Sequence, residues 1–193
     1  MNAMPRPANL LLFATFASVM VATRFHHFGT AINLPDASMA LFFLGGLFLR
    51  KHWQFAAYLA MALVIDWVAI EVVGTDDFCV TPAYSFLLPA YAVLWYGGRC
   101  YADRLQESVG SLAEAAGVGL LASVVSFAIS NGAFYWLGGR HTAPLDLTGH
   151  WQSFAQWMPL FVRTTMTYIV VALALYAVAA RVLRRDGQRP ASV

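Results

Sequence analysis

Charged residues are scarce in this chain of 193 residues, at 11% of the total, whereas about 25% is usual for a soluble domain. So few charges exclude an intrinsically disordered chain and a nucleic-acid-binding domain, which both depend on them. Cysteine is scarce too, and two cysteines are too few for a disulfide-stapled secreted module. Apolar residues, in contrast, make up 60% of the sequence. This composition indicates an integral membrane protein.

The sequence also lacks the short motifs of several enzyme classes. It contains no nucleotide-binding loop of the form G-x-x-x-x-G-K-[ST], no H-E-x-x-H and no C-x-x-C. If the protein is a transporter, its energy must therefore come from elsewhere than a nucleotide bound by this chain.

The apolar residues form six segments that polar clusters separate. A helix that crosses a hydrocarbon core of about 30 Å needs about 20 mainly apolar residues. The sequence therefore predicts a single all-α membrane domain over residues 1–193, a bundle of six transmembrane helices. The expected helices cover residues 8–23, 35–50, 53–73, 82–98, 109–137 and 152–182.

Lysine and arginine divide unevenly between the two sides that these helices define. With the N-terminus in the cytoplasm, the outer loops hold only Arg24 and Arg140, and Arg163 falls within a span. The positive-inside rule therefore predicts that both termini are cytoplasmic. The cytoplasmic side then holds Arg6, Arg50, Lys51, Arg99, Arg104, Arg181, Arg184, Arg185 and Arg189.

Asp66 is an ionisable residue inside an expected span, about two turns below the outer end of the third helix. Such a group is costly in a membrane and usually has a function. One interpretation is that Asp66 lines a binding cavity. The other is an ion pair with Arg163, and the two are compatible if the pair lines the cavity.

His26, His27 and Cys79 are expected near the outer surface. Imidazole and thiolate ligands suit transition metals, but the set is too small for a closed structural zinc site. It suits a metal that brings most of its own ligands, as in a corrin or porphyrin ring. Asp76 and Asp77 disfavour a free thiolate at Cys79, whereas a bound metal would deprotonate it. Alternatively, Cys79 is a buried and inert residue.

Small residues recur every four positions on the first expected helix, at Ala14, Ser18 and Ala22. Such a face allows close contact between helices, and if the first helix is outermost it favours contact with a partner subunit. The fifth expected helix repeats the spacing, and there we expect internal packing, at Ala115, Gly119 and Ser123.

The run FCVTPAY from Phe78 to Tyr84, the pair His26-His27 and the pair Asp66-Trp67 now combine with six short-looped helices. Together they resemble the substrate-binding S-components of energy-coupling-factor (ECF) transporters. The most similar group is the cobalamin-specific BtuM-like group of Gram-negative bacteria. The arrangement of six helices covers nearly the whole chain. Cys79 is the most distinctive residue of the resemblance.

The resemblance implies a six-helix bundle in the bacterial inner membrane, with a ligand cavity that opens outward. It implies cobalamin as the transported ligand, with Cys79 ligating cobalt and with His27, Asp66 and Tyr84 lining the same site. It also implies coupling to a membrane T-component and two cytoplasmic ATPases. Family members meet the T-component through an Ala-x-x-x-Ala face, in which Ser18 takes the middle position here.

Other functions stay open. The chain could be an S-component for another vitamin, in which case Cys79 has no role in binding. It could instead be a membrane haem or metal-binding redox protein that uses His27 and Cys79. We expect a transporter subunit and not an enzyme, although a thiolate on cobalt could displace a bound cyanide by ligand exchange.

Overall fold

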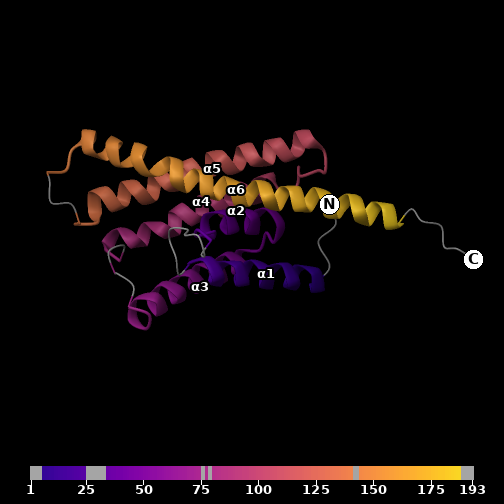
Figure 1. Ribbon diagram of the computed structural model, residues 1–193, viewed down its shortest axis with the longest axis horizontal. Helices are drawn as coiled ribbons and strands as arrows, with labels where there is room; N and C mark the ends of the chain where they lie inside the picture. The colour runs from indigo at the N-terminus through magenta and orange to yellow at the C-terminus, as the bar shows by residue number, and fades with distance from the viewer. Residues whose placement is uncertain (1–5, 25–33, 75–76, 78–79, 141–143, 188–193) are drawn as a thin grey trace, which may run out of the picture.

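The computed structural model describes residues 6–24, 34–74, 77, 80–140 and 144–187 (Figure 1). Over these residues the chain is helical and contains no β-strand, which confirms the all-α prediction. The elements in chain order are α1 (Arg6–Arg24), α2 (Ser38–Phe48), α3 (His52–Glu71), the 3-10 helix η1 (Pro82–Phe86), α4 (Leu87–Tyr101), α5 (Val109–Leu137) and α6 (Leu147–Gly187).

Two aspartates set helix starts that differ from the predicted ones. The carboxylate of Asp36 accepts hydrogen bonds from the backbone N–H of Ser38, at 2.8 Å, and from its hydroxyl, at 2.6 Å. Helix α2 therefore begins at Ser38 and not at residue 35. Asp146 accepts a hydrogen bond from the backbone N–H of Gly149 at 2.6 Å, as an N-cap residue does. Helix α6 therefore begins five residues earlier than predicted.

The predicted helix over 82–98 is divided into two kinds of helix. Residues Pro82–Phe86 form η1, and the α-helix proper begins at Leu87. Pro89 has no N–H to donate to the carbonyl of Ser85, so the α-helical ladder cannot extend back through this turn. The tighter 3-10 turn is the local solution.

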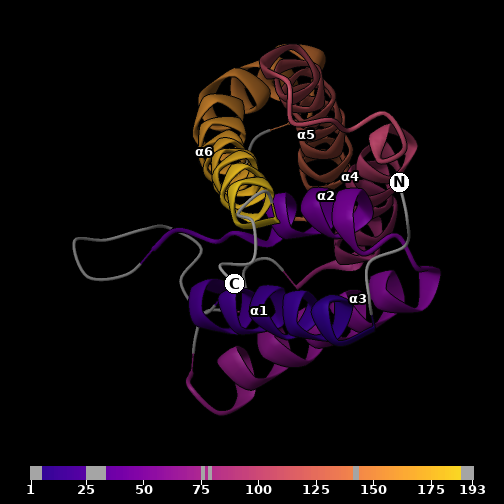
Figure 2. The same cartoon turned by 90° about the vertical axis from the view of Figure 1, so that its right-hand side faces the viewer.

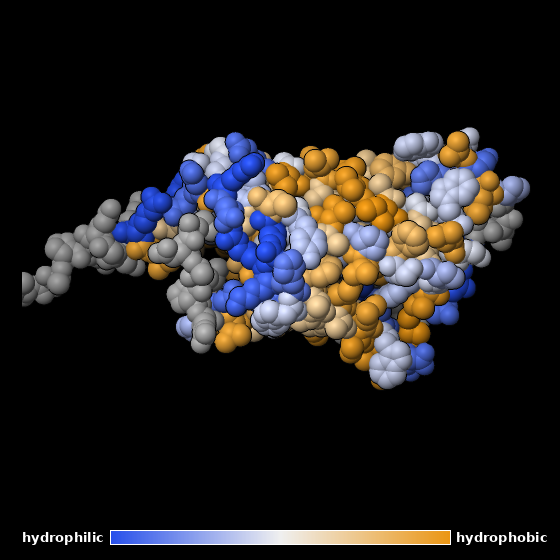
Figure 3. Space-filling model, turned by 180° about the vertical axis from the view of Figure 1, so that it is seen from behind, coloured by the Kyte–Doolittle hydropathy of each residue, from blue (hydrophilic) through white to orange (hydrophobic). Residues whose placement is uncertain are grey.

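Four helices, α1, α3, α5 and α6, are long and apolar enough to cross a membrane. Helix α2 is shorter, with 11 residues, which corresponds to about 16 Å. Large apolar side chains such as Leu11, Val64, Leu121 and Leu175 lie exposed on the long helices. One face of the molecule shows a hydrophobic band between two more hydrophilic ends (Figure 3). A surface of this kind indicates a membrane-embedded protein.

Helix α2 lies between two groups of helices, with α1 and α3 on one side and α4, α5 and α6 on the other (Figure 2). Nine of its eleven residues are buried. It packs closely on α4 because glycines stand where the backbones meet. A Cβ atom on Gly46 would lie 1.8 Å from the carbonyl oxygen of Trp95, and one on Gly98 would lie 2.1 Å from that of Phe43.

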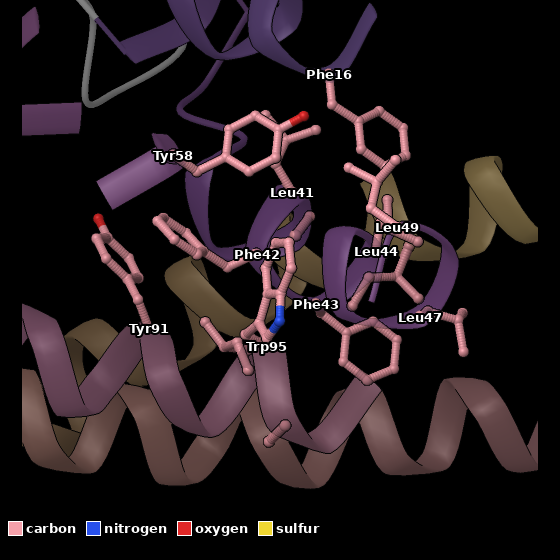
Figure 4. Close-up of a cluster of buried hydrophobic side chains, with 14 of the residues drawn as sticks. Phe16, Leu41, Phe42, Phe43, Leu44, Leu47, Leu49, Tyr58, Tyr91 and Trp95 are labelled. Carbon is pink, nitrogen blue, oxygen red and sulfur yellow. The ribbon is translucent and has the colours of Figure 1, made fainter. Parts of the chain in front are cut away.

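Aromatic side chains fill the core around α2 (Figure 4). The rings of Phe42 and Tyr91 stack with their centroids 4.1 Å apart. Trp95 is fully buried and lies against Tyr58 and Phe55. This rigid centre fixes the positions of α3 and α4, which carry the polar residues described next.

The two ends of the bundle differ in charge. We name one the Asp66 end; there α1 and α3 finish at Arg24 and Glu71, and α6 begins at Leu147. We name the other the basic end, because it holds Arg50, Lys51, Arg99, Arg104, Arg181 and Arg184. Lysine and arginine thus divide unevenly between the two ends of the described part of the chain.

Candidate functional site

An arginine and an aspartate form a buried ion pair at the Asp66 end. Arg24 is the last residue of α1 and is only 3% exposed. Its Nε donates to Oδ1 of Asp66 at 2.7 Å, and its Nη2 donates to Oδ2 at 2.7 Å. Asp66, on α3, is 12% exposed. This two-point geometry fixes both side chains and is the strongest form of such a pair.

Three more elements contribute to this pair. Nη1 of Arg24 donates to the hydroxyls of Ser38, at 2.8 Å, and of Tyr91, at 2.9 Å. Asp36 lies 3.6 Å from the same nitrogen. The hydroxyl of Tyr84, on η1, donates to Oδ2 of Asp66. We name this set the Arg24 cluster: Arg24, Asp36, Ser38, Asp66, Tyr84 and Tyr91.

The Arg24 cluster compensates the buried positive charge of the Arg24 guanidinium, which would otherwise be costly to desolvate. A buried guanidinium needs both a counter-charge and hydrogen-bond acceptors. Arg24 has them, since four of the five guanidinium N–H donors have an acceptor. Counted by formal charge, one arginine and two aspartates leave the cluster with one negative charge in excess. It therefore suits a neighbour that donates hydrogen bonds or bears positive charge.

An open cleft of about 250 Å³ borders the cluster. Asp66 and Tyr84 belong to both, so the cluster contributes two side chains to the wall of the cleft. Trp67, which is 61% exposed, supplies an aromatic surface. The described lining combines three carboxylates with apolar side chains: Leu63, Asp66, Trp67, Ile70, Glu71, Asp77, Val80 and Tyr84.

A larger cavity of about 720 Å³ lies at the basic end, between the loop before α5 and the last turns of α6. Arg181, Arg184 and Glu107 line it, and Arg184 forms an ion pair with Glu107 at 2.7 Å. It contains none of the residues that the sequence predicted for a ligand site. We therefore take the cleft at the Asp66 end as the candidate site.

The structure brings together two of the four predicted ligand-binding residues. Asp66 and Tyr84 are hydrogen-bonded to each other, although they are 18 residues apart and come from different helices. His27 and Cys79 lie outside the described residues, as do His26 and Asp76. Among the described residues, no group of three His, Cys, Asp or Glu side chains could hold a metal ion.

The alternative pairing of Asp66 with Arg163 is wrong. Asp66 pairs with Arg24, and Arg163 lies on the exposed face of α6. Within the described chain, α6 packs against α5 and α2 and does not reach α3. Sequence analysis treated Arg24 as an outer-loop charge and so missed its role. The predicted topology could have indicated this pair, because the first and third helices run in the same direction. Arg24 and Asp66 therefore lie at a similar depth.

The two small-residue faces have different surroundings. Ala115, Gly119 and Ser123 on α5 are buried, which confirms the predicted internal packing. The face of α1 is exposed along its whole length, at Ala14, Ser18 and Ala22. The Ser18 hydroxyl donates to the carbonyl of Ala14 at 2.9 Å, so it presents no unsatisfied polar group. Contact of this face with a partner subunit stays a prediction.

A family model described as "Family of unknown function (DUF6580)" matches residues 4–189. The chain belongs to this family. A search of curated proteins finds no match.

Proposed function

We propose that this member of the DUF6580 family is the S-component of an ECF transporter and captures cobalamin at the Asp66 end. The observation that supports the proposal is the meeting of Asp66 and Tyr84 on the wall of an open cleft. The resemblance assigns both residues to one ligand site, and their separation in the sequence does not require them to be close.

The chemistry of the cleft suits an edge of this ligand. Cobalamin carries amide groups around its corrin ring, and the ring faces are apolar. The carboxylate of Asp66 can accept a hydrogen bond from an amide N–H, and Trp67, Leu63 and Ile70 offer apolar surface. Pockets for small ligands usually combine apolar walls with a few polar groups in this way.

A volume of about 250 Å³ holds only part of so large a ligand. We assign the remaining contacts to His27 and Cys79. A soft thiolate can occupy an axial position of cobalt, and binding to the metal would keep Cys79 deprotonated despite the aspartates beside it. Displacement of a bound cyanide would follow from this bond as a ligand exchange.

The proposed orientation places the Asp66 end outside the cell, so that the cleft faces the incoming vitamin. Six helices cross the bacterial inner membrane, and the basic end and both termini lie in the cytoplasm. The arginines of the basic end support this orientation through the positive-inside rule. An impermeant thiol reagent applied to intact cells should therefore modify Cys79 and leave Cys100 unmodified. The reverse pattern would contradict the orientation.

Transport then requires partners. We propose that the exposed face of Ala14, Ser18 and Ala22 contacts the T-component, and that two cytoplasmic ATPases supply the energy. The small side chains on this face allow close approach of another helix. Replacing both Ser18 and Ala22 by leucine should block uptake in cells and leave cobalamin binding intact. Normal uptake would exclude this face as the docking surface.

The visible spectrum of the purified protein with cyanocobalamin tests the proposal. We expect the cobalt absorption bands to shift over time with the wild-type protein. Cys100→Ser, the matched control, should behave like the wild type, whereas Cys79→Ser should lose the shift. Identical spectra for wild type and Cys79→Ser would exclude a cobalt–sulfur bond. Binding of added haem without binding of cobalamin would favour the redox protein instead.

A further inference from the structure

Helix α1 has two faces that serve different purposes. One face carries the exposed small residues Ala14, Ser18 and Ala22, and the opposite face buries Phe16 and Met20 in the core. The buried face ends in Arg24, at the last residue of the helix. The same rigid rod therefore carries the proposed docking surface and one member of the Arg24 cluster.

Side-chain hydrogen bonds hold α1 to α3 at three levels. Gln54 donates to the side chain of Asn9 at 2.9 Å, and the Tyr58 hydroxyl donates to the carbonyl of Phe13 at 2.8 Å. The third level is the pair of Arg24 and Asp66. Of these three levels, only this last one includes a residue that lines the cleft.

We propose that Arg24 couples occupancy of the cleft to the position of α1, an inference that rests on the proposed function. The carboxylate of Asp66 bonds the buried Arg24 and also lines the open cleft. A ligand that covers the cleft removes water from the partly exposed side of Asp66. The ion pair then lies in a medium of lower dielectric constant, where its attraction is stronger. An occupied cleft therefore holds the end of α1 more firmly than an empty one.

The chemistry of arginine is needed for this role. Its planar fork bonds both carboxylate oxygens and still reaches Ser38 on α2 and Tyr91 on α4. Lysine would keep the charge but could not make all four contacts in one geometry. The cleft lining does not include Arg24. Arg24 is thus a positioning residue that acts on α1 through Asp66, and not a ligand-binding residue.

Backbone hydrogen exchange tests this coupling in the full-length protein in lipid nanodiscs, with and without saturating cyanocobalamin. In the wild type, we expect the ligand to slow exchange in residues 16–24 roughly tenfold, as a strengthened charge-assisted contact would. Arg24→Lys should reduce this slowing to less than about twofold while cobalamin is bound. Arg163→Lys, the same change at an exposed site on α6, should retain the wild-type response. Residues 109–137 of α5 provide the internal reference.

The possible outcomes separate the two proposals. Absence of cobalamin binding to the wild type overturns the proposed function, and the coupling with it. Binding with the same response in wild type and Arg24→Lys overturns the coupling alone. If Arg24→Lys does not fold, Tyr91→Phe provides the second test, because it removes one contact of Arg24 and keeps both charges. An undiminished response in Tyr91→Phe then counts against the coupling.

Discussion

The two ends of the bundle both contain arginine–aspartate pairs, but in opposite surroundings. At the Asp66 end, Arg24 is 3% exposed and makes four hydrogen bonds. At the basic end, Arg50 pairs with Asp103, which is 84% exposed. The same two side-chain types thus form a fixed internal contact in one place and a solvated surface contact in the other.

This difference shows where the chain places its costly polar groups. Exposed ion pairs contribute little to stability because water competes with them. A buried pair needs near-complete hydrogen bonding to offset its desolvation, and removing one partner leaves the other charge uncompensated. Four helical elements besides α1 contribute residues or flanking loops to the Arg24 cluster. In the proposed function, the position of the cluster beside an open cleft connects this arrangement with ligand capture.

The largest expected contrast is in stability. Asp66→Ala leaves the Arg24 guanidinium buried without its main partner and should lower the free energy of unfolding by about 3–5 kcal/mol. Asp103→Ala makes the same change at the basic end and should cost no more than about 1 kcal/mol. Titration with sodium dodecyl sulfate in mixed micelles measures the free energy of unfolding of both variants. Equal losses for the two variants would show that burial does not distinguish the two pairs.

A smaller contrast is expected for two tyrosines. Tyr91→Phe removes the acceptor of a buried N–H of Arg24 and should cost about 1.5–3 kcal/mol. Tyr96 is more exposed and contacts His52 at 2.9 Å, so Tyr96→Phe should change stability by less than about 0.5 kcal/mol. The same unfolding titration compares them. An unchanged free energy of unfolding in Tyr91→Phe would mean that the Tyr91 hydroxyl does not stabilise Arg24.

The smallest expected effect comes from salt. Raising ionic strength from 0.1 to 1 M shortens the Debye length from about 10 Å to about 3 Å. At 1 M salt the exposed pair of Arg50 and Asp103 is screened even in the wild type. The destabilisation caused by Asp103→Ala should therefore disappear. The effect of Asp66→Ala should persist, since water and ions hardly reach Arg24. Comparable salt dependence in the two variants would contradict the buried position of the cluster.

Much of the fold could be predicted from hydropathy, since each of the six predicted segments corresponds to helical structure. The fifth was predicted with the bounds it has, at 109–137, because a polar cluster limits it at both ends. The starts of α2 and α6 depend on hydrogen bonds that the carboxylates of Asp36 and Asp146 accept from backbone N–H groups, which hydropathy does not register. The change from η1 to α4 depends on the missing N–H of Pro89.

The candidate site was only half predictable. Asp66 was identified because a charge stands in an apolar segment, and Tyr84 through the resemblance. Arg24 was missed because the predicted first helix ended at residue 23, which left Arg24 among the outer-loop charges, whereas α1 extends to Arg24. Ser38 and Tyr91 gave no signal, since a small hydroxyl and an aromatic ring are both common in helix packing. Their role follows from tertiary contacts between helices that are distant in the sequence.

Equilibrium binding of cyanocobalamin to matched variants of the two ends tests the central claim most directly. Asp66→Asn keeps the shape of the side chain but removes a charged acceptor from the cleft, and should weaken binding roughly tenfold or more. Asp103→Asn, at the basic end, should bind like the wild type. Gel filtration of each variant confirms that it is folded at the temperature used. Equal affinities for Asp66→Asn and the wild type, or no binding to the wild type, would contradict cobalamin capture at the Asp66 end.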